Sequence, residues 1–458
     1  MKYKYIIIIL GFLLLSYFPH LPASTGQESL SDSRESAATA DPFSQKKFLP
    51  NISFILDFSY VRRDLDQGFF EALEIPGFIH GHSHHEGHSH AGFNADKGFN
   101  LNYGELVLSS AVDPYFDLFT AFHLSESSFE IEEAYIESRS LPYGFRLKLG
   151  RFLSGFGRIN SQHAHYWDFS DIPLVYRVFF GDHGLLEKGI QLNWVAPTAF
   201  YLGLGVECLQ GTNENSFGTK NAALTDAGSG EPITLEKVPL PNTWNFFGKT
   251  SLDAGDLTLL AGVSYAFGQA RLDHFADEEN PHGFTGDSSI LGVDFTAKYL
   301  LGSYTYLALQ GEYLYRKMQG TRFLVHEAGI PAAVGIGKVS EEEHQHEEGH
   351  EVVGAPMTKK QSGLYVQGVF RFHRQWRLGA RWDWLNRNNI TLAGTLLNLP
   401  GQLNRYSVMV DFSPTEFSRI RLQYNHNGYA FHEEERKKYH EWVLQFNLAI
   451  GAHGAHSF

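Results

Sequence analysis

The chain has 458 residues, a formal net charge of −14 at pH 7, 14% aromatic residues, 45 glycines and 17 prolines. The negative balance argues against nucleic acid as a partner, because contacts with phosphate depend on Lys and Arg. Because Cys208 is the single cysteine, an intramolecular disulfide is excluded. Cys208 also lies far from the expected signal cleavage site, so we expect no lipoprotein anchor there. The many glycines and aromatic residues favour a large sheet with many turns.

The N-terminus is expected to carry a secretory signal peptide, residues 1–23. Two lysines precede an apolar run, residues 6–15, and the small residue Ala23 suits cleavage. This run is too short to span a bilayer, which takes about 20 residues. Residues 24–50 show no hydrophobic period, and we expect them to form a flexible periplasmic segment.

Apolar and polar residues alternate along nearly all of the remaining chain, which is typical of strands with one apolar and one polar face. In the first such stretch Phe54, Leu56 and Phe58 alternate with polar residues, and Ile55 breaks the pattern. The apolar set is expected to face lipid. In two later strands it comprises Leu364, Val366, Phe370, Leu444, Phe446 and Leu448.

This alternation predicts about 16 strands. They are expected near residues 51–61, 101–113, 116–126, 129–139, 145–152, 187–196, 199–210, 243–253, 257–268, 288–300, 304–318, 362–373, 376–386, 403–413, 417–427 and 440–451. Very short turns join alternate pairs, and longer connections join the others, with residues 126–128 as the exception. An even number of strands with short turns on one side and long loops on the other is typical of outer-membrane barrels.

The predicted fold is therefore all-β: residues 51–458 form a transmembrane antiparallel β-barrel of about 16 strands, with short periplasmic turns and long extracellular loops. In lipid the sheet must close, because an open edge leaves backbone groups unpaired. A terminal Phe458 after an alternating strand resembles the C-terminal signal of many such barrels. The alternative is a soluble all-β protein such as tandem sandwiches, in which so regular an alternation of connections is unusual.

Several motifs carry a resemblance to a known family. They are Glu132-Glu133-Ala134-Tyr135-Ile136, Leu147-Lys148-Leu149-Gly150-Arg151-Phe152, Phe156-Gly157-Arg158-Ile159-Asn160, Gln162-His163-Ala164-His165-Tyr166-Trp167-Asp168-Phe169 and Asp171-Ile172-Pro173-Leu174-Val175. Together they resemble porin-like outer-membrane proteins often labelled zinc-regulated or TonB-dependent receptors. Members typically show Gln-His-Pro-His, whereas Ala164 replaces the proline here. The resemblance covers most of the mature chain and implies metal uptake.

The TonB part of that label does not suit this chain. TonB-dependent transporters carry a folded N-terminal plug inside a 22-stranded barrel. Here only residues 24–50 lie between the predicted cleavage site and the first strand. TonB is therefore not expected as a partner, and a barrel of about 16 strands leaves an aqueous lumen that favours passive diffusion.

Two histidine tracts lie in predicted long loops. Their histidines are His80, His82, His84, His85, His88 and His90 in the first tract and His344, His346 and His350 in the second. Imidazole with carboxylate suits Zn²⁺, and also Ni²⁺ or Cu²⁺, and the lack of thiolates argues against Cu(I). By strand parity both loops face outward, where they are expected to bind metal loosely. The alternative is a solvated low-complexity loop that binds metal only incidentally.

The predicted loop at residues 153–186 is a second candidate site. It is long and aromatic-rich, and we expect it to enter the lumen and narrow it. Its polar candidates are the metal ligands His163, His165 and His183 and the pore-lining Asp168 and Asp171. These residues either line a path for cations or pack the loop against the barrel wall, and the sequence leaves both open.

Basic residues with lumen-facing parity form a third candidate feature. They are Arg146, Lys148, Arg371, Arg377, Arg381, Arg405, Arg419 and Arg421. A basic wall prefers anions, which conflicts with uptake of free Zn²⁺. An opposed acidic wall, for which Glu130, Glu132 and Glu133 are candidates, or transport of an anionic metal chelate would resolve the conflict.

These features predict an outer-membrane, porin-like channel whose external histidine-rich loops bind divalent metal and aid zinc uptake. The alternative is a surface metal-binding or adhesion protein that uses the barrel only as an anchor. No motif supports an enzyme, and we expect no catalytic residue. The expected partners are outer-membrane lipid and metal ions or metal chelates, and a homotrimer is left open.

Overall fold

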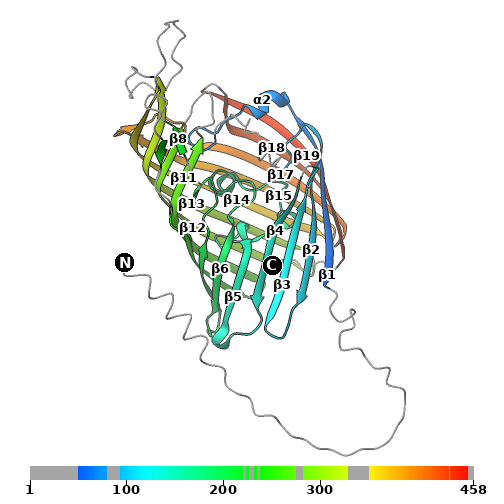
Figure 1. Ribbon diagram of the computed structural model, residues 1–458. Coiled ribbons are helices and arrows are strands. Elements are labelled where there is room, and N and C mark those ends of the chain that lie inside the picture. Colours follow the sequence, from blue (N-terminus) through cyan, green and yellow to red (C-terminus); the bar gives the residue numbers. More distant parts are fainter. Residues whose placement is uncertain are drawn as a thin grey trace, which may run out of the picture. The chain divides into compact units, whose positions relative to one another are not determined.

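The computed structural model describes residues 50–79, 93–126, 128–219, 223–225, 232–234, 238–274, 282–327, 350–432 and 434–451. Within these residues one antiparallel sheet contains seventeen strands (Figure 1). One of them, β16 (Thr395–Leu396), is only two residues long. The other sixteen build the wall of a barrel, so the predicted number of strands is confirmed.

The bounds of the strands and helices follow the chain. The wall strands are β1 (Asn51–Arg63), β2 (Gly98–Ala111), β3 (Phe116–Leu124), β4 (Phe129–Ser138), β5 (Phe145–Leu153), β6 (Leu186–Val195), β7 (Tyr201–Leu209), β10 (Thr243–Ala254), β11 (Leu257–His274), β12 (His282–Leu300), β13 (Tyr306–Glu327), β14 (His350–His373), β15 (Trp376–Leu392), β17 (Leu403–Thr415), β18 (Ser418–His432) and β19 (Glu435–Gly451). The remaining elements are the hairpin β8 (Ala223–Thr225) and β9 (Pro232–Thr234), the α-helices α2 (Gln67–Glu71) and α3 (Leu174–Phe180), and the 3₁₀ turns η2 (Pro142–Gly144), η3 (Ile159–Ser161) and η4 (Ala164–Tyr166).

The sheet closes on itself because β1 pairs with both β2 and β19. The closing ladder runs from Ser53 opposite Gly451 to Arg63 opposite Glu441. Closure leaves the wall without an exposed strand edge, which is the condition for a sheet in lipid. The predicted transmembrane antiparallel barrel is therefore confirmed. Among the described residues, no helix is long and apolar enough to cross a membrane.

The two faces of the wall follow the predicted alternation. On β19, Leu444, Phe446 and Leu448 are more exposed than the buried Gln445 and Asn447 between them. On β14, Leu364, Val366 and Phe370 likewise alternate with buried positions such as Tyr365 and Gln367. All six predicted lipid-facing residues thus point outward, and polar side chains point inward.

Several strands extend beyond their predicted ends. β12, β13 and β14 have 19, 22 and 24 residues, whereas β3 to β7 have 9 or 10. A long loop was expected between residues 427 and 440, but β18 and β19 pair there as far as His432 opposite Glu435. Outside the lipid a strand needs no apolar outer face. The alternation of apolar and polar residues therefore ends earlier along the chain than the hydrogen-bonded pairing of the strands.

The connection between β5 and β6, residues 154–185, lies inside the barrel (Figure 1). We call it the lumenal loop. Four aromatic side chains of this loop are at most 1% exposed: Phe156, Phe169, Tyr176 and Phe179. Three of them pack with inward residues of the wall in one extended apolar core, and Phe169 belongs to a smaller cluster. Gly157 turns the chain with a φ of 61°, and a Cβ there would collide with the Tyr176 hydroxyl. The prediction that this segment enters the lumen is confirmed.

Candidate lumenal site

One side of the lumenal loop is held by arginines of β15, β17 and β18, which we call the basic wall: Arg377, Arg381, Arg405, Arg419 and Arg421. Asp171 of the loop accepts a hydrogen bond from Arg381 at 2.9 Å and pairs with Arg405. Asp168 accepts one from Arg377 at 2.8 Å. Burial by itself raises the pKa of Asp171, but the two arginines that it faces lower it to about 2. This carboxylate therefore stays charged in neutral solution.

The remaining charge of the basic wall is also matched. Asp383 accepts from Arg381 at 2.9 Å and from Arg405 at 3.0 Å, and Asp411 accepts from Arg421 at 2.8 Å. Arg421 and Arg419 each donate at 2.8 Å to backbone carbonyls of the loop. Five residues predicted to line the pore thus bind the lumenal loop or the wall itself. Arg371, near the end of β14 and opposite Arg377 in the ladder, donates to the carbonyl of Arg374 in the turn that follows.

The other side of the loop is tied to carboxylates of β7 and β13. Glu312 accepts hydrogen bonds from the backbone N–H groups of Arg158 and Ile159, both at 2.8 Å, and from the Tyr176 hydroxyl at 2.6 Å. Glu207 accepts from the N–H of Gly155 at 2.7 Å. Anchors on several strands around the wall, from β7 through β13 to β18, fix the path of the loop in the lumen. No local sequence pattern predicts these pairs, because they join residues far apart in the chain.

A cavity of about 850 Å³ lies beside the loop, against β1, β2, β4 to β7 and β10. It extends from the short-turn ends of these strands, at Asn51, Ser109 and Tyr201, as far as His163 and His165 of the loop. The predicted basic residues of β5 also line it; they are Arg146 and Lys148. Water and small ions can therefore reach the loop from the side of the short turns.

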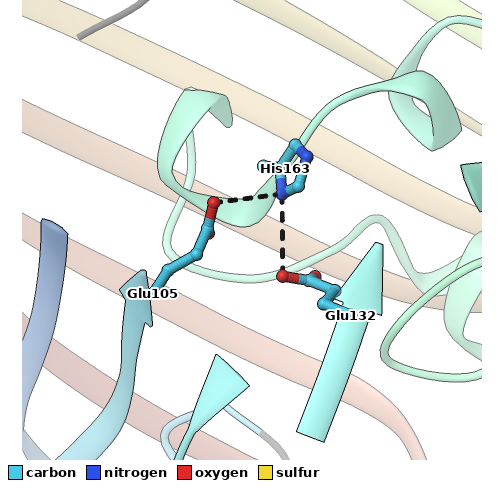
Figure 2. Close-up of side chains that lie close together, drawn as sticks. All are labelled: Glu105, Glu132 and His163. Carbon is cyan, nitrogen blue, oxygen red and sulfur yellow. Dashed lines mark ion pairs between the residues drawn. The ribbon is translucent and has the colours of Figure 1, made fainter. Parts of the chain in front are cut away.

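At the inner end of this cavity, His163 lies among three carboxylates, which we call the acidic wall: Glu105 of β2 and Glu132 and Glu133 of β4. Its Nδ1 lies 3.4 Å from Glu105 and 3.6 Å from Glu132 (Figure 2). Its Nε2 lies 2.7 Å from Glu133. Nδ1 of His165 is 3.3 Å from the second oxygen of Glu105. Two of the predicted metal-ligand histidines are thus brought together with acidic residues.

A β-bulge explains how two consecutive glutamates reach the same side of β4. Ala121 of β3 pairs with Glu133 and Phe122 pairs with Ile131, so Glu132 is an extra residue in the ladder. A bulge of this kind re-aims side chains and is common beside functional sites. It turns Glu132 and Glu133 toward His163 together, which strict alternation would forbid.

Burial by itself lowers the pKa of His163, but the negative charge of Glu105 and the contacts with Glu132 and Glu133 raise it well above its usual range. The imidazole is therefore a cation at neutral pH and offsets part of the surrounding charge. Glu105, which is 2% exposed, was not singled out from the sequence. Its one available signal is its inward parity in β2.

His183, the third predicted loop ligand, does not join this group. Its ring contacts those of Phe93 and His123, at 6.1 Å and 5.9 Å between centroids. Of the two histidine tracts, His80 to His90 and His344 and His346 lie outside the described residues, and only the backbone of His350 is described, at the start of β14. Residues 1–49 and Phe458 also lie outside the described part.

Fold and site together define an outer-membrane-type β-barrel whose lumen is partly filled by its own chain. No family model matches the sequence. A protein of Aquifex aeolicus, described as uncharacterized, is 47% identical over 427 residues, which are 93% of this chain and 84% of that protein. The chain belongs to the same family as this Aquifex aeolicus protein. The resemblance to zinc-regulated receptors stays a prediction.

Among solved structures, the chain is similar to an anion-selective porin from Comamonas acidovorans, with 10% identity and a TM-score of 0.47 over 88% of this chain and 99% of that one. It is also similar to the channel DcaP of Acinetobacter baumannii, with 11% identity and a TM-score of 0.45 over 88% and 97%. It is similar as well to OmpT, an outer membrane protein of Vibrio cholerae, with 9% identity and a TM-score of 0.45 over 88% of this chain and 97% of that one. The barrel topology given above is drawn from the strand pairing of this chain itself.

Proposed function

We propose that the protein is an outer-membrane channel for small cations, narrowed by its lumenal loop, and that its histidine-rich loops gather divalent metal above it. The observation that carries this proposal is the cavity that ends at the acidic wall. Rings of carboxylates favour cations in a pore. The cavity is lined by both signs of charge, since Arg146, Lys148 and Lys249 face it as well as carboxylates. A cation that passes these basic residues reaches Glu105 and Glu133 at the inner end before it meets any arginine of the basic wall.

The basic wall offers little attraction to anions, in spite of its five arginines. Asp168, Asp171, Asp383 and Asp411 accept hydrogen bonds from four of them, whereas Arg419 donates only to loop carbonyls. Charges paired with carboxylates contribute little to the field felt by a passing ion. This pairing reduces the conflict between a basic lumen and metal uptake.

The histidine tracts add a collecting step to this proposal. Imidazole and carboxylate groups on loops outside the membrane raise the local concentration of Zn²⁺, and also of Ni²⁺ and Cu²⁺. Export by a cleaved signal peptide and long external loops, both expected from the sequence, are required for it. The transported solute is then the free ion or a small complex, and the tracts hold it loosely enough to release it.

The rival function is a surface metal-binding protein that uses the barrel as an anchor. The observation in its favour is the apolar core that the lumenal loop forms with the wall, which reaches from Phe152 and Leu209 to Leu385 and Tyr439. A filled lumen conducts no ions. The two functions therefore differ in one measurable property.

Single-channel recording in planar bilayers separates them. We expect a small conductance whose reversal potential in a KCl gradient shows preference for K⁺. The double variant Glu105→Gln, Glu132→Gln is expected to lose this preference, whereas Glu137→Gln, on the same strand and lining the same cavity, keeps it. Deleting residues 154–182 is expected to enlarge the conductance. Absence of conductance in all of these proteins would support the anchor instead.

A further inference from the structure

The ligand atoms of Glu105, Glu132 and His163 have the spacing of a metal site. One oxygen of each carboxylate and one ring nitrogen lie within 4.8 Å of one another. A tetrahedral zinc ion with bonds of about 2.0–2.1 Å holds its ligands about 3.3–3.4 Å apart. The observed separations from Nδ1 of His163 are 3.4 Å and 3.6 Å. The two distances to the imidazole are thus close to those of a tetrahedral site, and the two carboxylate oxygens lie within 4.8 Å of each other (Figure 2).

The second nitrogen of His163 has the partner that a metal ligand requires. Metal-binding histidines almost always donate their other N–H to a carboxylate or carbonyl, which fixes the tautomer and the orientation of the ring. Nε2 of His163 lies 2.7 Å from Glu133, and the other oxygen of Glu133 accepts the N–H of Leu153 at 2.6 Å. This carboxylate is thus held in place from the backbone, and it leaves Nδ1 to face Glu105 and Glu132.

The charge of the site also calls for a cation. Three carboxylates meet around one imidazole at the inner end of the cavity, and Glu105 is almost fully buried. Within the described residues, Oε1 of Glu105 accepts no hydrogen bond of good geometry. A buried carboxylate oxygen without a hydrogen bond is costly unless a cation faces it. The ion-pair contact with His163 meets only part of this demand.

We propose that the barrel binds one divalent transition-metal ion of the zinc type inside its lumen, coordinated by Glu105, Glu132 and Nδ1 of His163, with Glu133 orienting the imidazole. The nitrogen and oxygen donors suit Zn²⁺, Ni²⁺ or Co²⁺ rather than a soft Cu(I) ion. The cavity reaches His163, so water can complete the coordination and take up the proton that the imidazolium loses from Nδ1 when the ion binds. This inference deepens the proposed function by giving the channel a metal site apart from the histidine tracts.

The test is made on full-length refolded protein in which the nine tract histidines are changed to serine. Equilibrium dialysis against Zn²⁺ with metal analysis is expected to give one bound ion per chain. In this background His163→Asn and Glu132→Gln are each expected to abolish that ion. Glu133→Gln is expected to weaken binding about 10–100-fold, since it removes only the partner of the ligand.

The matched control is Glu137→Gln, which removes another carboxylate that lines the cavity and is expected to leave binding unchanged. Folding of every variant is checked by the resistance of the barrel to unfolding in detergent. The inference is overturned if the tract-free protein binds no zinc, or if His163→Asn and Glu132→Gln bind it as well as Glu137→Gln. Binding and conductance are separate readouts. If zinc binds but no conductance is measured, the channel function is rejected and the metal site is supported. If the protein conducts but binds no lumenal zinc, the metal site is rejected and the channel function is supported.

Discussion

The basic wall and the acidic wall bury charge against the same loop, but with opposite results. On β15, β17 and β18 each arginine finds a carboxylate or a carbonyl, several of them supplied by Asp168 and Asp171 of the loop. On β2 and β4 the loop supplies His163 and His165 to three glutamates. On the first surface four of the five arginines are paired with carboxylates, and the second keeps excess negative charge. The charge of a lumen-facing residue therefore says little until its partner is known.

The largest effect is expected from breaking the basic wall at Asp171. Asp171→Asn leaves Arg381 and Arg405 with Asp383 as their shared carboxylate, and removing one partner from a buried ionic group costs about 3–5 kcal/mol. We expect urea unfolding of the refolded barrel to show this loss of stability, and single-channel recordings to show a larger conductance as the loop detaches.

The control for this change is Asp182→Asn, on the same loop. Asp182 pairs with Arg177 at 3.3 Å, and both side chains are about one third exposed. An exposed pair contributes about 0–1 kcal/mol, so little change is expected. Equal losses in the two variants would mean that the basic wall does not anchor the loop.

The next effect tests the register on which both walls depend. Phe446 of β19 faces outward, between the ladders to β1 and β18. An arginine there, if near the midplane of the bilayer, should cost about 2–4 kcal/mol of folding stability. The measurement is unfolding in lipid vesicles. Phe446→Leu provides the contrast, because it keeps an apolar side chain toward lipid, and little loss is expected. Equal stability of the arginine and leucine variants would contradict the outward assignment.

Acid should release the basic wall in a defined window. The pKa of Asp171 is about 2 in the folded protein, below the value of about 3.9 for an unperturbed Asp. A depressed pKa adds stability that is fully present above about pH 4 and is lost as the pH falls toward 2. The conductance is expected to stay constant down to about pH 4 and to rise below it. Asp171→Asn should already conduct at the higher level and show no such rise. A profile shared by both proteins would exclude Asp171 as the titrating group.

The fold was largely predictable from the sequence, because the period of two is visible in most wall strands and the connections carry turn residues. The inward loop was predictable for a related reason, since a long aromatic-rich connection needs apolar surface to cover it. The ends of β13 and β14 were not, because strands outside lipid lose the apolar outer face that identifies them.

The candidate site was predictable only in part. His163 and His165 stand out in a loop, whereas Glu105 looks like any polar inward residue of a strand. The run Glu130-Ile131-Glu132-Glu133 fits either register, and the bulge that decides between them depends on hydrogen bonding with β3. Arginines and aspartates were both recognised as lumenal, but not as each other's partners. Their pairing depends on the path of the loop, which local sequence does not encode.

The smallest effect is expected at the histidine tracts, and it sharpens the contrast with the acidic wall. Free loops lose conformational entropy when three or four of their imidazoles gather round an ion, so each site should be weaker than a preformed one. We expect calorimetric titration of the parent protein to show several weak zinc ions per chain besides the single lumenal one. Ni²⁺ and Cu²⁺ should displace these weak ions, since nothing in the tracts imposes tetrahedral geometry on the metal. Changing His80, His82, His84, His85, His88, His90, His344, His346 and His350 to serine should remove them and keep the lumenal ion. If that variant binds as many ions as the parent, the tracts are not metal sites. This result would reject the collecting step of the proposed function and would leave the proposed lumenal site unaffected.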